Sequence, residues 1–404
     1  MTLPKIAKKI ISDTLLHLSP INNYSHMIKF YHNSVRIKDD TYNLPAKIHI
    51  FGVGKAASYE VQALRELFIK NGLQDKLGHC VSYTKINHTV EEKGLLQFEG
   101  THPVISAENL EKTSLFLREL KKIKNQDCLF FLLSGGASSL LELPLKQMKF
   151  STLRVIHQDL LASGMNINAM NQVRKSISQI KNGGLRNYIP TDNIIQFITC
   201  DIPNADLSDV GSGPLLSKNI NLREVNSYLE KFDIKLNETD NSVVNVKSYI
   251  SQSAEILLQL MSVPQKMINK GIYDGGLEEL ISLQKKDLPS KGYTFLSGGE
   301  ATLTVPPQAG KGGRNTHYVL AMASELYRFE ENRDIHILSF GTDGTDGPTD
   351  AAGAYINYAL YSKLDSVQYL RNFDSYTFFE KIGSLIKTGP TRTNVMDIRA
   401  MWRE

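Results

Sequence analysis

Residues 340–354 read FGTDGTDGPTDAAGA, so three aspartates, Asp343, Asp346 and Asp350, lie among glycines with few hydrophobic side chains. A fixed glycine loses backbone entropy, and aspartate and threonine compete for backbone hydrogen bonds, so neither a helix nor a strand favours this run. The carboxylates can serve a metal or a substrate, because hard oxygen ligands suit Mg²⁺. They can equally form Asx turns and helix caps. For Asp350 we expect a helix cap.

Three basic residues lie in glycine-rich turns, where a side chain can approach a ligand closely: Lys55 in GVGKAAS, and Lys311 and Arg314 in GKGGRN. Arginine suits bidentate contact with phosphate or carboxylate, whereas lysine acts as a point charge. Phosphoryl transfer needs positive charge on the moving group and a divalent metal, so these turns are compatible with that chemistry. The candidate metal ligands are Asp201, Asp343 and Asp346.

Two glycine-rich turns, SGGASS at 134–139 and GKGGRN at 310–315, could present backbone N–H groups to a phosphate. Neither is a Walker A loop, and GVGKAA offers only a weak GxGxxA match to the dinucleotide fingerprint. Nucleotide binding by these turns would therefore use neither common signature. The candidate cofactor-binding residues are Ser134, Gly135, Gly136, Ser138, Ser139, Lys311, Gly312 and Gly313.

Short apolar runs that predict strands precede these motifs. They lie in residues 46–58, 127–144, 194–214, 293–305 and 335–340. The first leads into a helix with apolar residues at helical spacing, and in the fourth a second strand is expected to follow the glycine turn. Strands that alternate with helices favour an α/β fold with parallel sheets, in which ligands bind beyond the carboxyl ends of the strands. We therefore expect the motifs to share a polar cleft, although tight turns alone would also explain each glycine.

The chain has 404 residues, enough for two domains, and its net charge of +4 is scattered, which argues against a nucleic-acid-binding stripe. Three widely spaced cysteines suggest a reducing cytoplasm rather than a disulfide framework. No apolar stretch approaches the ~20 residues that cross a bilayer, so we expect no membrane partner. In the basic N-terminal segment, Ile6, Ile10, Leu15 and Leu16 favour a docked amphipathic helix over a targeting presequence. The polar stretch 236–245 is the expected domain boundary.

The motifs LSGGASSLLELP, NQVRKSISQIKNGGL, LSGGEATLTV, GKGGRN, GTDGTDGPTDAAGA and TGPTRTNV together resemble the class II glycerate kinases, or glycerate 2-kinases, whose C-terminal part is the MOFRL domain. The resemblance covers nearly the whole chain. It implies two α/β domains, each with a mainly parallel sheet covered by helices, and an active site in the cleft between them. The Rossmann-like domain would span 1–235 and the MOFRL-type domain 245–390, with 390–404 a candidate for rejoining the first.

The reaction that the resemblance implies moves the γ-phosphoryl group of ATP to the 2-hydroxyl of D-glycerate, with Mg²⁺. Lys55 and Arg314 match the family positions thought to be catalytic. Other matching motifs supply candidate substrate-binding residues: Asn171, Arg174, Ser212, Gly213, Glu300, Arg392 and Asn394.

Several positions depart from the family pattern. CDIPNAD carries Cys200 and Asn204–Ala205 where the family tends to have Ser and Gly-Asp, and Thr316 and His317 follow GGRN. Arg392 replaces a glycine, where it could line the acceptor pocket, point to solvent or pair with a carboxylate such as Asp397. We expect His317 to be a substitution on a helix surface. These changes bear on the choice of acceptor more than on the reaction class.

Alternative functions remain: a kinase of a larger sugar acid, a hydroxypyruvate reductase-type oxidoreductase, and a non-catalytic ligand-binding homologue. The reductase needs a dinucleotide site, for which GVGKAA is weak evidence. We expect a cytoplasmic enzyme whose partners are ATP and a small hydroxy acid, with a homodimer as a further candidate and no nucleic acid.

Overall fold

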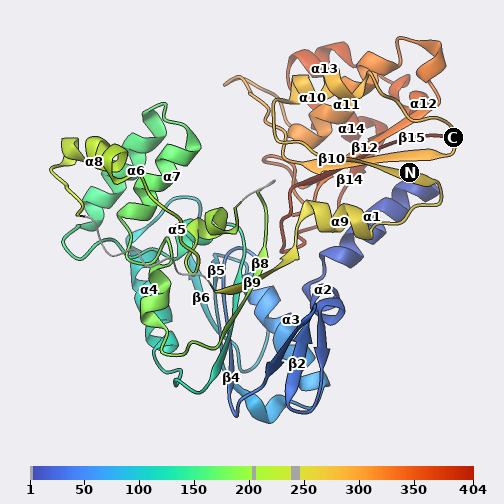
Figure 1. Cartoon of the computed structure of the whole chain (residues 1–404). Coiled ribbons are helices and arrows are strands. Elements are labelled where there is room, and N and C mark those ends of the chain that lie inside the picture. The colour runs from blue at the N-terminus through green and yellow to red at the C-terminus, as the bar shows by residue number, and fades with distance from the viewer. Residues whose placement is uncertain (1–2, 203–205, 238–245) are drawn as a thin grey trace. The chain divides into compact units, whose positions relative to one another are not determined.

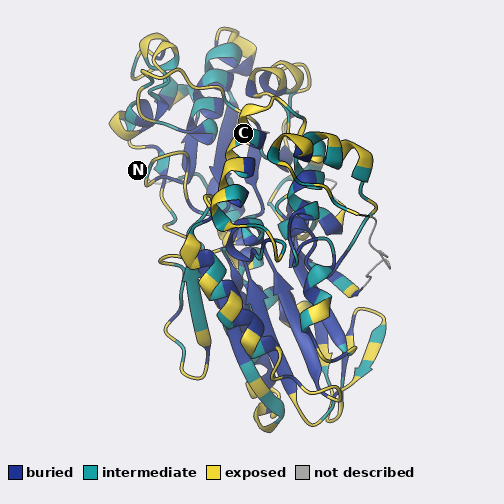
Figure 2. Ribbon diagram, turned by 90° about the vertical axis from the view of Figure 1, so that its left-hand side faces the viewer, coloured by how far each residue is buried: buried dark blue, intermediate teal, exposed yellow. Residues whose placement is uncertain are grey.

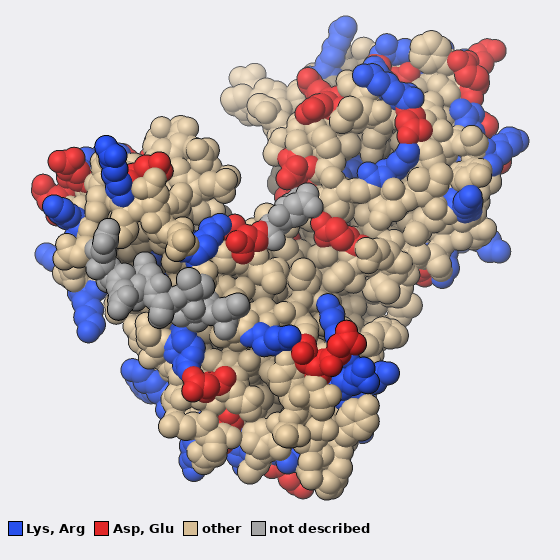
Figure 3. Space-filling view, viewed as in Figure 1, with Lys and Arg blue, Asp and Glu red and all other residues tan. Residues whose placement is uncertain are grey.

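The computed structural model describes residues 3–202, 206–237 and 246–404 (Figure 1). The chain divides into two compact units. The N-terminal unit contains residues 24–200, 206–237 and 246–251, and the C-terminal unit contains 3–23, 201–202 and 252–404. No helix in the described ranges is long and apolar enough to cross a membrane. On the face shown in Figure 3, basic and acidic side chains are interspersed.

The N-terminal unit is built on a six-stranded sheet in the order β6-β5-β4-β7-β8-β9. Its strands are β4 (Ile48–Val53), β5 (Leu77–Lys85), β6 (Leu96–Gly100), β7 (Cys128–Leu133), β8 (Ile194–Thr199) and β9 (Lys247–Gln252). The pairs β4–β5, β4–β7, β5–β6 and β7–β8 are all parallel, so the predicted parallel α/β sheet is confirmed here. Every residue of β4, β7 and β8 is buried, as expected for strands covered on both faces.

Helices and a small hairpin sheet complete this unit. The helices are α3 (Ala57–Lys70), α4 (Ala107–Leu120), α5 (Ala137–Leu140), α6 (Phe150–Ala162), α7 (Ile167–Ser176) and α8 (Leu222–Leu229). Strands β1 (Ile28–Phe30), β2 (Ser34–Ile37) and β3 (Asp40–Asn43) pair antiparallel. The helix predicted after the first strand is α3, which buries Val61, Leu64, Leu67 and Phe68. Apolar residues of α6, α7 and α8 form a separate small core.

The C-terminal unit contains a second six-stranded sheet, in the order β10-β11-β15-β12-β13-β14. Its strands are β10 (Lys266–Ile272), β11 (Tyr293–Gly299), β12 (Ile335–Gly341), β13 (Gly353–Ile356), β14 (Leu385–Ile386) and β15 (Asp397–Arg403). Its helices are α1 (Lys5–Leu18), α9 (Ala254–Leu260), α10 (Leu277–Gln284), α11 (Arg314–Leu326), α12 (Tyr358–Tyr361), α13 (Val367–Arg371) and α14 (Ser375–Ile382), and α2 (Pro20–Met27) spans the boundary between the units. Figure 2 shows that the strands of both sheets are largely buried and that the helices around them expose their outer faces.

The prediction of a mainly parallel second sheet is wrong. Only β10 and β11 pair parallel, whereas β15 is antiparallel to β11 and β12, and β13 is antiparallel to β12 and β14. The chain returns from β12 to β13 without a crossover helix, so it reverses direction. The second strand expected after the glycine turn in 293–305 is also absent, because the described residues there contribute only a bridge between Gly276 and Thr302.

The units also differ from the predicted domain boundaries. Residues 390–404 do not rejoin the N-terminal domain, since β15 lies in the centre of the second sheet. The N-terminal helix forms as predicted and belongs to the C-terminal unit, where Ile10 is buried and Ile6 packs against the core as expected, but the second half of the predicted face is not buried. Ala7, Ile10 and Leu18 join the core there, whereas Leu15 and Leu16 are 39% and 54% exposed. Asp13 is also buried, and hydrogen bonds from Lys9 and Ser262 to its carboxylate compensate for the lost contact with water.

Candidate active site

In the C-terminal unit, the ends of three strands converge on Arg314. Because β15 runs antiparallel between β11 and β12, its first residue, Asp397, lies opposite Gly299 and Gly341, the last residues of those strands. Arg314 begins α11 and donates from Nε to Asp397 Oδ2 at 2.6 Å and from Nη2 to Oδ1 at 3.0 Å. A third nitrogen, Nη1, lies 2.7 Å from Glu300 Oε1. Two sequence-predicted residues, Arg314 and Glu300, are therefore in direct contact.

The electrostatics of this group favour a fixed charge. Burial opposes the charge of Arg314, but the carboxylates of Asp397 and Glu300 outweigh it and raise the pKa of the guanidinium. The Arg314 side chain remains 30% exposed, whereas Asp397 is fully buried. Asp397 also accepts a hydrogen bond from Asn315 Nδ2 at 2.9 Å. A charged arginine in one geometry, with part of its surface open, is suited to bind an anionic group.

Asp346 caps helix α11. Its Oδ1 accepts from Asn315 N at 2.8 Å, and its Oδ2 accepts from Thr316 N at 2.8 Å and Thr316 Oγ1 at 2.7 Å. These bonds engage both oxygens, and the residue is 1% exposed, so Asp346 fits a helix cap and not the predicted metal ligand. Burial raises its pKa.

Asp343 lies at the other end of the same loop. Its Oδ1 accepts from the N–H and hydroxyl of Thr345, at 2.9 and 3.0 Å, which is the Asx turn expected as the alternative to metal binding. Within the described chain, Oδ2 has no hydrogen-bond partner. A Cβ at Gly341 would lie 3.2 Å from Asp343 Oδ1 and 3.5 Å from Asp397 Oδ1, so the loop carries Asp343 close to Asp397. Asp350 does not cap a helix, because it accepts from Tyr376 OH and Lys387 Nζ.

The turn 310–313 is close-packed. A Cβ at Gly312 would lie 2.5 Å from Ser375 Oγ, and one at Gly313 would lie 2.3 Å from Asp346 Oδ1, so these glycines allow the turn to approach its neighbours. The Lys311 ammonium lies 3.7 Å from the centre of the Tyr376 ring. Phosphate binding by these three residues remains a prediction. His317 packs its ring against Phe373 and is partly buried, so the expected surface substitution is only half right.

In the N-terminal unit, the loops after β4 and β7 are hydrogen-bonded to each other. Lys55 N donates to Gly135 O at 2.9 Å, and Ala56 N donates to Ser134 Oγ at 3.2 Å. Gly54 has φ +130°, and a Cβ there would lie 2.3 Å from Ser134 Oγ. The structure therefore brings Lys55 together with the predicted residues Ser134, Gly135 and Gly136. Ser138 and Ser139 follow in α5, where Ser139 Oγ donates to Gly136 O.

The loop after β8 packs on the same turn. A Cβ at Gly211 would lie 3.0 Å from the Cβ of Ala137. Ser212 and Gly213 both have positive φ, and their carbonyls accept from Asn182 N and Gly183 N at 3.0 and 2.7 Å. Asp201 follows β8 and is half-buried, and Asn204–Ala205 lie outside the described residues.

Asn171 and Arg174 lie on α7, which packs against α8. Arg174 Nη1 donates to Asn171 Oδ1 at 3.4 Å. Asn171 lines a polar cavity of about 280 Å³ together with Lys175, Asp209 and Lys218. Both ammonium groups bind Asp209, so their charges are partly compensated.

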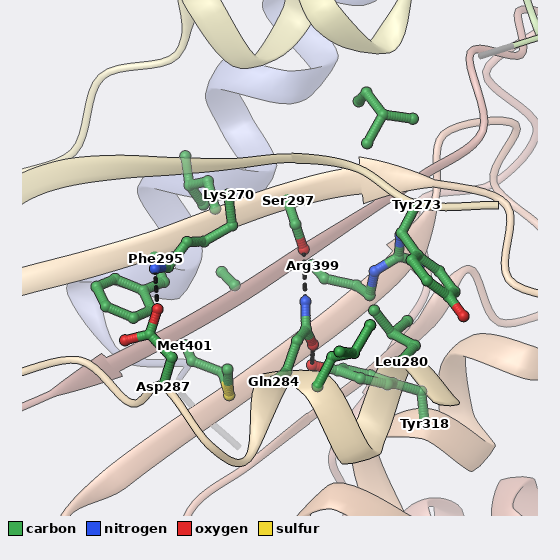
Figure 4. A pocket seen from close by; sticks show the side chains of 14 residues that line it. Lys270, Tyr273, Leu280, Gln284, Asp287, Phe295, Ser297, Tyr318, Arg399 and Met401 are labelled. Carbon is green, nitrogen blue, oxygen red and sulfur yellow. Dashed lines mark hydrogen bonds and ion pairs between the residues drawn. The ribbon is translucent and has the colours of Figure 1, made fainter. Parts of the chain in front are cut away.

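A further cavity of about 220 Å³ lies in the C-terminal unit between α10, α11 and strands β10, β11 and β15 (Figure 4). Gln284 spans it by donating to Ser297 Oγ at 3.0 Å and accepting from Tyr318 OH at 2.5 Å. Arg399 reaches it from β15 and lies 3.8 Å from Asp397. None of the sequence-predicted site residues lines this cavity.

Two comparisons decide the family. A model described as "Domain of unknown function (DUF4147)" matches residues 6–247, and a model of the MOFRL family matches residues 293–397. The D-glycerate 2-kinase of Thermotoga maritima is 31% identical to the chain, over 87% of this chain and 89% of that protein. The chain belongs to the class II glycerate kinase family. It is also 30% identical to an Agrobacterium vitis protein whose name proposes hydroxypyruvate reductase activity, over 87% of this chain and 86% of that one.

The fold agrees with this family. A crystal structure of the glycerate kinase of Thermotoga maritima matches with a TM-score of 0.84 and 28% identity, covering 99% of each chain. The family's phosphotransferase activity on an alcohol group is therefore also the activity class of this enzyme.

Two residues at the site were not predicted as site residues. Asp397 stands at the start of a buried strand, DIRAMWR, so its place two residues after TGPTRTNV was the available signal. His102 follows β6, a short and partly exposed strand that the sequence did not reveal. Its ring lies against the turn that holds Lys55.

Arg392, where the family tends to have glycine, has φ +62° and is exposed. It does not pair with Asp397, whose carboxylate binds Arg314 and Asn315. An L-residue in the left-handed region is strained by roughly 1 kcal/mol relative to glycine. A role for Arg392 in the acceptor pocket remains a prediction.

We expect the free energy of unfolding of Arg392→Gly to be roughly 0.5–1 kcal/mol higher than that of Arg392→Ala. Both substitutions remove the arginine side chain, but only glycine relieves the backbone strain. Chemical denaturation of the two variants measures this difference. If the alanine variant is equally stable, the backbone at this position is not strained.

Glu60 on α3 lies behind the Lys55 turn. Burial raises its pKa to about 7, and hydrogen bonds from Thr199 and Ser134 only partly oppose this effect. The native state therefore keeps a proton that the unfolded state releases near pH 4.5. The resulting stabilisation is complete below pH 4.5 and is lost as pH rises to about 7.

The free energy of unfolding of the wild type should therefore fall between pH 5 and pH 8 by on the order of 2 kcal/mol more than that of Glu60→Gln. Urea denaturation at the two pH values measures the change. Glu66→Gln is the matched control, since Glu66 lies on the same helix but is exposed. An equal decline in wild type and Glu60→Gln would mean that Glu60 is already ionised at pH 5.

Proposed function

We propose that this enzyme transfers the γ-phosphoryl group of ATP to the 2-hydroxyl of D-glycerate, producing ADP and 2-phosphoglycerate, with Mg²⁺ as cofactor. The observation that carries the proposal is the fixed, partly exposed guanidinium of Arg314, held by Asp397 and Glu300 at the end of a sheet. The names of the family's kinases, including the D-glycerate 2-kinase of Thermotoga maritima, support the choice of substrate.

Arg314 would stabilise the charge on the transferred group. In the transition state the three equatorial oxygens of the phosphoryl group share negative charge, and positioning with electrostatic stabilisation supplies most of the catalysis. Nε and one N–H of Nη2 are engaged by Asp397 and Nη1 pairs with Glu300, so the N–H groups left over are oriented without further loss of side-chain freedom. Lys55 would add a point charge in the glycine-walled turn of the N-terminal unit.

Magnesium would supply positive charge that offsets the negative charge of the phosphates. Among the described residues, no group of three or more His, Cys, Asp or Glu side chains could hold a metal ion. Mg²⁺ in kinases needs only one or two carboxylates beside water and phosphate, so this arrangement remains compatible with Mg²⁺. Asp343, with one oxygen outside its Asx turn, fits such a ligand, and Asp201 stays a second candidate. Asp346 does not.

Three buried cysteines without disulfides, Cys80, Cys128 and Cys200, support a reducing, cytoplasmic setting. A homodimer remains a candidate assembly.

ADP release, followed with a panel of three- to six-carbon hydroxy acids, tests the function. D-glycerate should be phosphorylated in the presence of Mg²⁺, and a better rate with a larger acid would redirect the proposal to a sugar acid kinase. NADH oxidation with hydroxypyruvate tests the reductase, which one relative's name favours. ADP release that no acid stimulates would contradict the kinase proposal.

Arg314→Ala should lower turnover by a factor on the order of 10²–10⁴, because a transition-state contact is lost. Lys55→Ala should also lower it strongly. Arg328→Ala is the control, since Arg328 is an exposed arginine of the same unit that pairs with Glu325. Steady-state kinetics with correctly folded proteins measure the effect. Near-wild-type turnover in both site variants would show that the wrong loops have been assigned.

A further inference from the structure

The ends of three neighbouring strands in the N-terminal unit carry basic side chains. Lys55 follows β4, Lys85 ends β5, and His102 follows β6, which is the edge strand beside β5. Lys85 pairs in register with Gly100, two residues before His102. Because these strands are parallel, their carboxyl ends lie at one edge of the sheet, where ligands bind in α/β folds.

His102 reaches from this edge to the turn after β7. A Cβ at Gly136 would lie 3.0 Å from His102 Cδ2, 3.1 Å from His102 Nε2 and 3.1 Å from Lys55 Cγ. The His102 imidazole, the Lys55 side-chain stem and the Gly136 backbone therefore surround one small space. Any side chain at position 136 would occupy that space.

The His102 loop is held in place by the buried Asn109. The Asn109 side chain accepts from Thr101 N at 3.0 Å and donates to Thr101 O at 2.9 Å, and it also donates to Ser139 O at 2.8 Å. One side chain thus ties the loop after β6 to the turn that contains Gly136. In the described chain, no hydrogen bond from a protein group reaches the His102 ring.

The charges around the ring are positive. Burial, followed by the charges of Lys55, Lys85 and His88, lowers the pKa of His102 to about 4, so the imidazole is neutral at pH 7. The single carboxylate of β5 and β6, Glu99, accepts a hydrogen bond from the N–H of Asn87. A neutral imidazole can offer one N–H donor beside two ammonium groups without adding to their repulsion.

We propose that Lys55, Lys85 and His102 form an anion-binding site for a charged oxygen group of a substrate, with His102 as the hydrogen-bond donor. A phosphate and a carboxylate share this chemistry, and ATP and the hydroxy acid are the two sources that the proposed function provides. The naming of these sources rests on that function, whereas the anion site itself does not.

Calorimetric titration of the full-length protein with ATP, with tripolyphosphate and with D-glycerate tests the site without turnover. His102→Ala and Lys85→Met should each weaken binding of at least one of these ligands by roughly tenfold to a hundredfold, as expected for one hydrogen bond to a charged group. His102→Gln, which keeps an N–H donor, should weaken it less. Weaker tripolyphosphate and ATP binding would identify the bound group as phosphate, and weaker D-glycerate binding alone would identify a carboxylate.

The controls lie at the opposite ends of the same strands. His79→Gln changes a histidine near the start of β5, and Lys47→Met changes the lysine just before β4, so both should leave binding within twofold. If His102→Ala and Lys85→Met, folded by circular dichroism, also stay within twofold for all three ligands, the site does not exist. Weakened binding in an enzyme that phosphorylates no acid would support the site and contradict the proposed function.

Discussion

The bidentate ion pair between Arg314 and Asp397 organises the C-terminal unit. Asp397 is fully buried, and its carboxylate accepts from Arg314 and Asn315 and lies 3.8 Å from Arg399. Burying the Asp397 carboxylate without these partners would lower the stability of the fold by several kcal/mol. The start of α11, which carries Arg314 and Asn315, must therefore lie beside the start of β15, which carries Asp397. The same constraint brings the ends of β11 and β12 to the pair, and with them Glu300 and the acidic loop.

The sequence predicted the features that depend on local pattern. Continuous apolar runs predicted the buried strands β4, β7, β8, β11 and β12, and helical spacing predicted α3. Glycine-rich turns after these strands predicted that the motifs would gather at strand ends, and within each unit the structure brings Lys55 to Ser134–Gly136 and Arg314 to Glu300. These predictions hold because a turn's position is set by the strand that precedes it, and parallel strands end at one edge.

Features that depend on distant partners could not be predicted. Nothing in DIRAMWR indicates that it inserts antiparallel between two strands, so Asp397 was missed as the partner of Arg314. Asp343 and Asp346 looked alike in a repeated GTDG pattern, yet only Asp346 meets the N-terminus of α11. His102 was missed because it follows a short edge strand with a weak sequence signal. Its place beside the Lys55 turn also depends on contact with Gly136, which lies over 30 residues away in the sequence.

The central claim is that Asp397 holds Arg314 in the geometry that transfers the phosphoryl group. Single-turnover phosphoryl transfer by Asp397→Asn tests it most directly, because the substitution keeps the shape and removes the charge. The account predicts a rate constant lower by a factor on the order of 10² or more, with substrate dissociation constants nearly unchanged and the protein still folded. A rate constant within threefold of the wild type would contradict it.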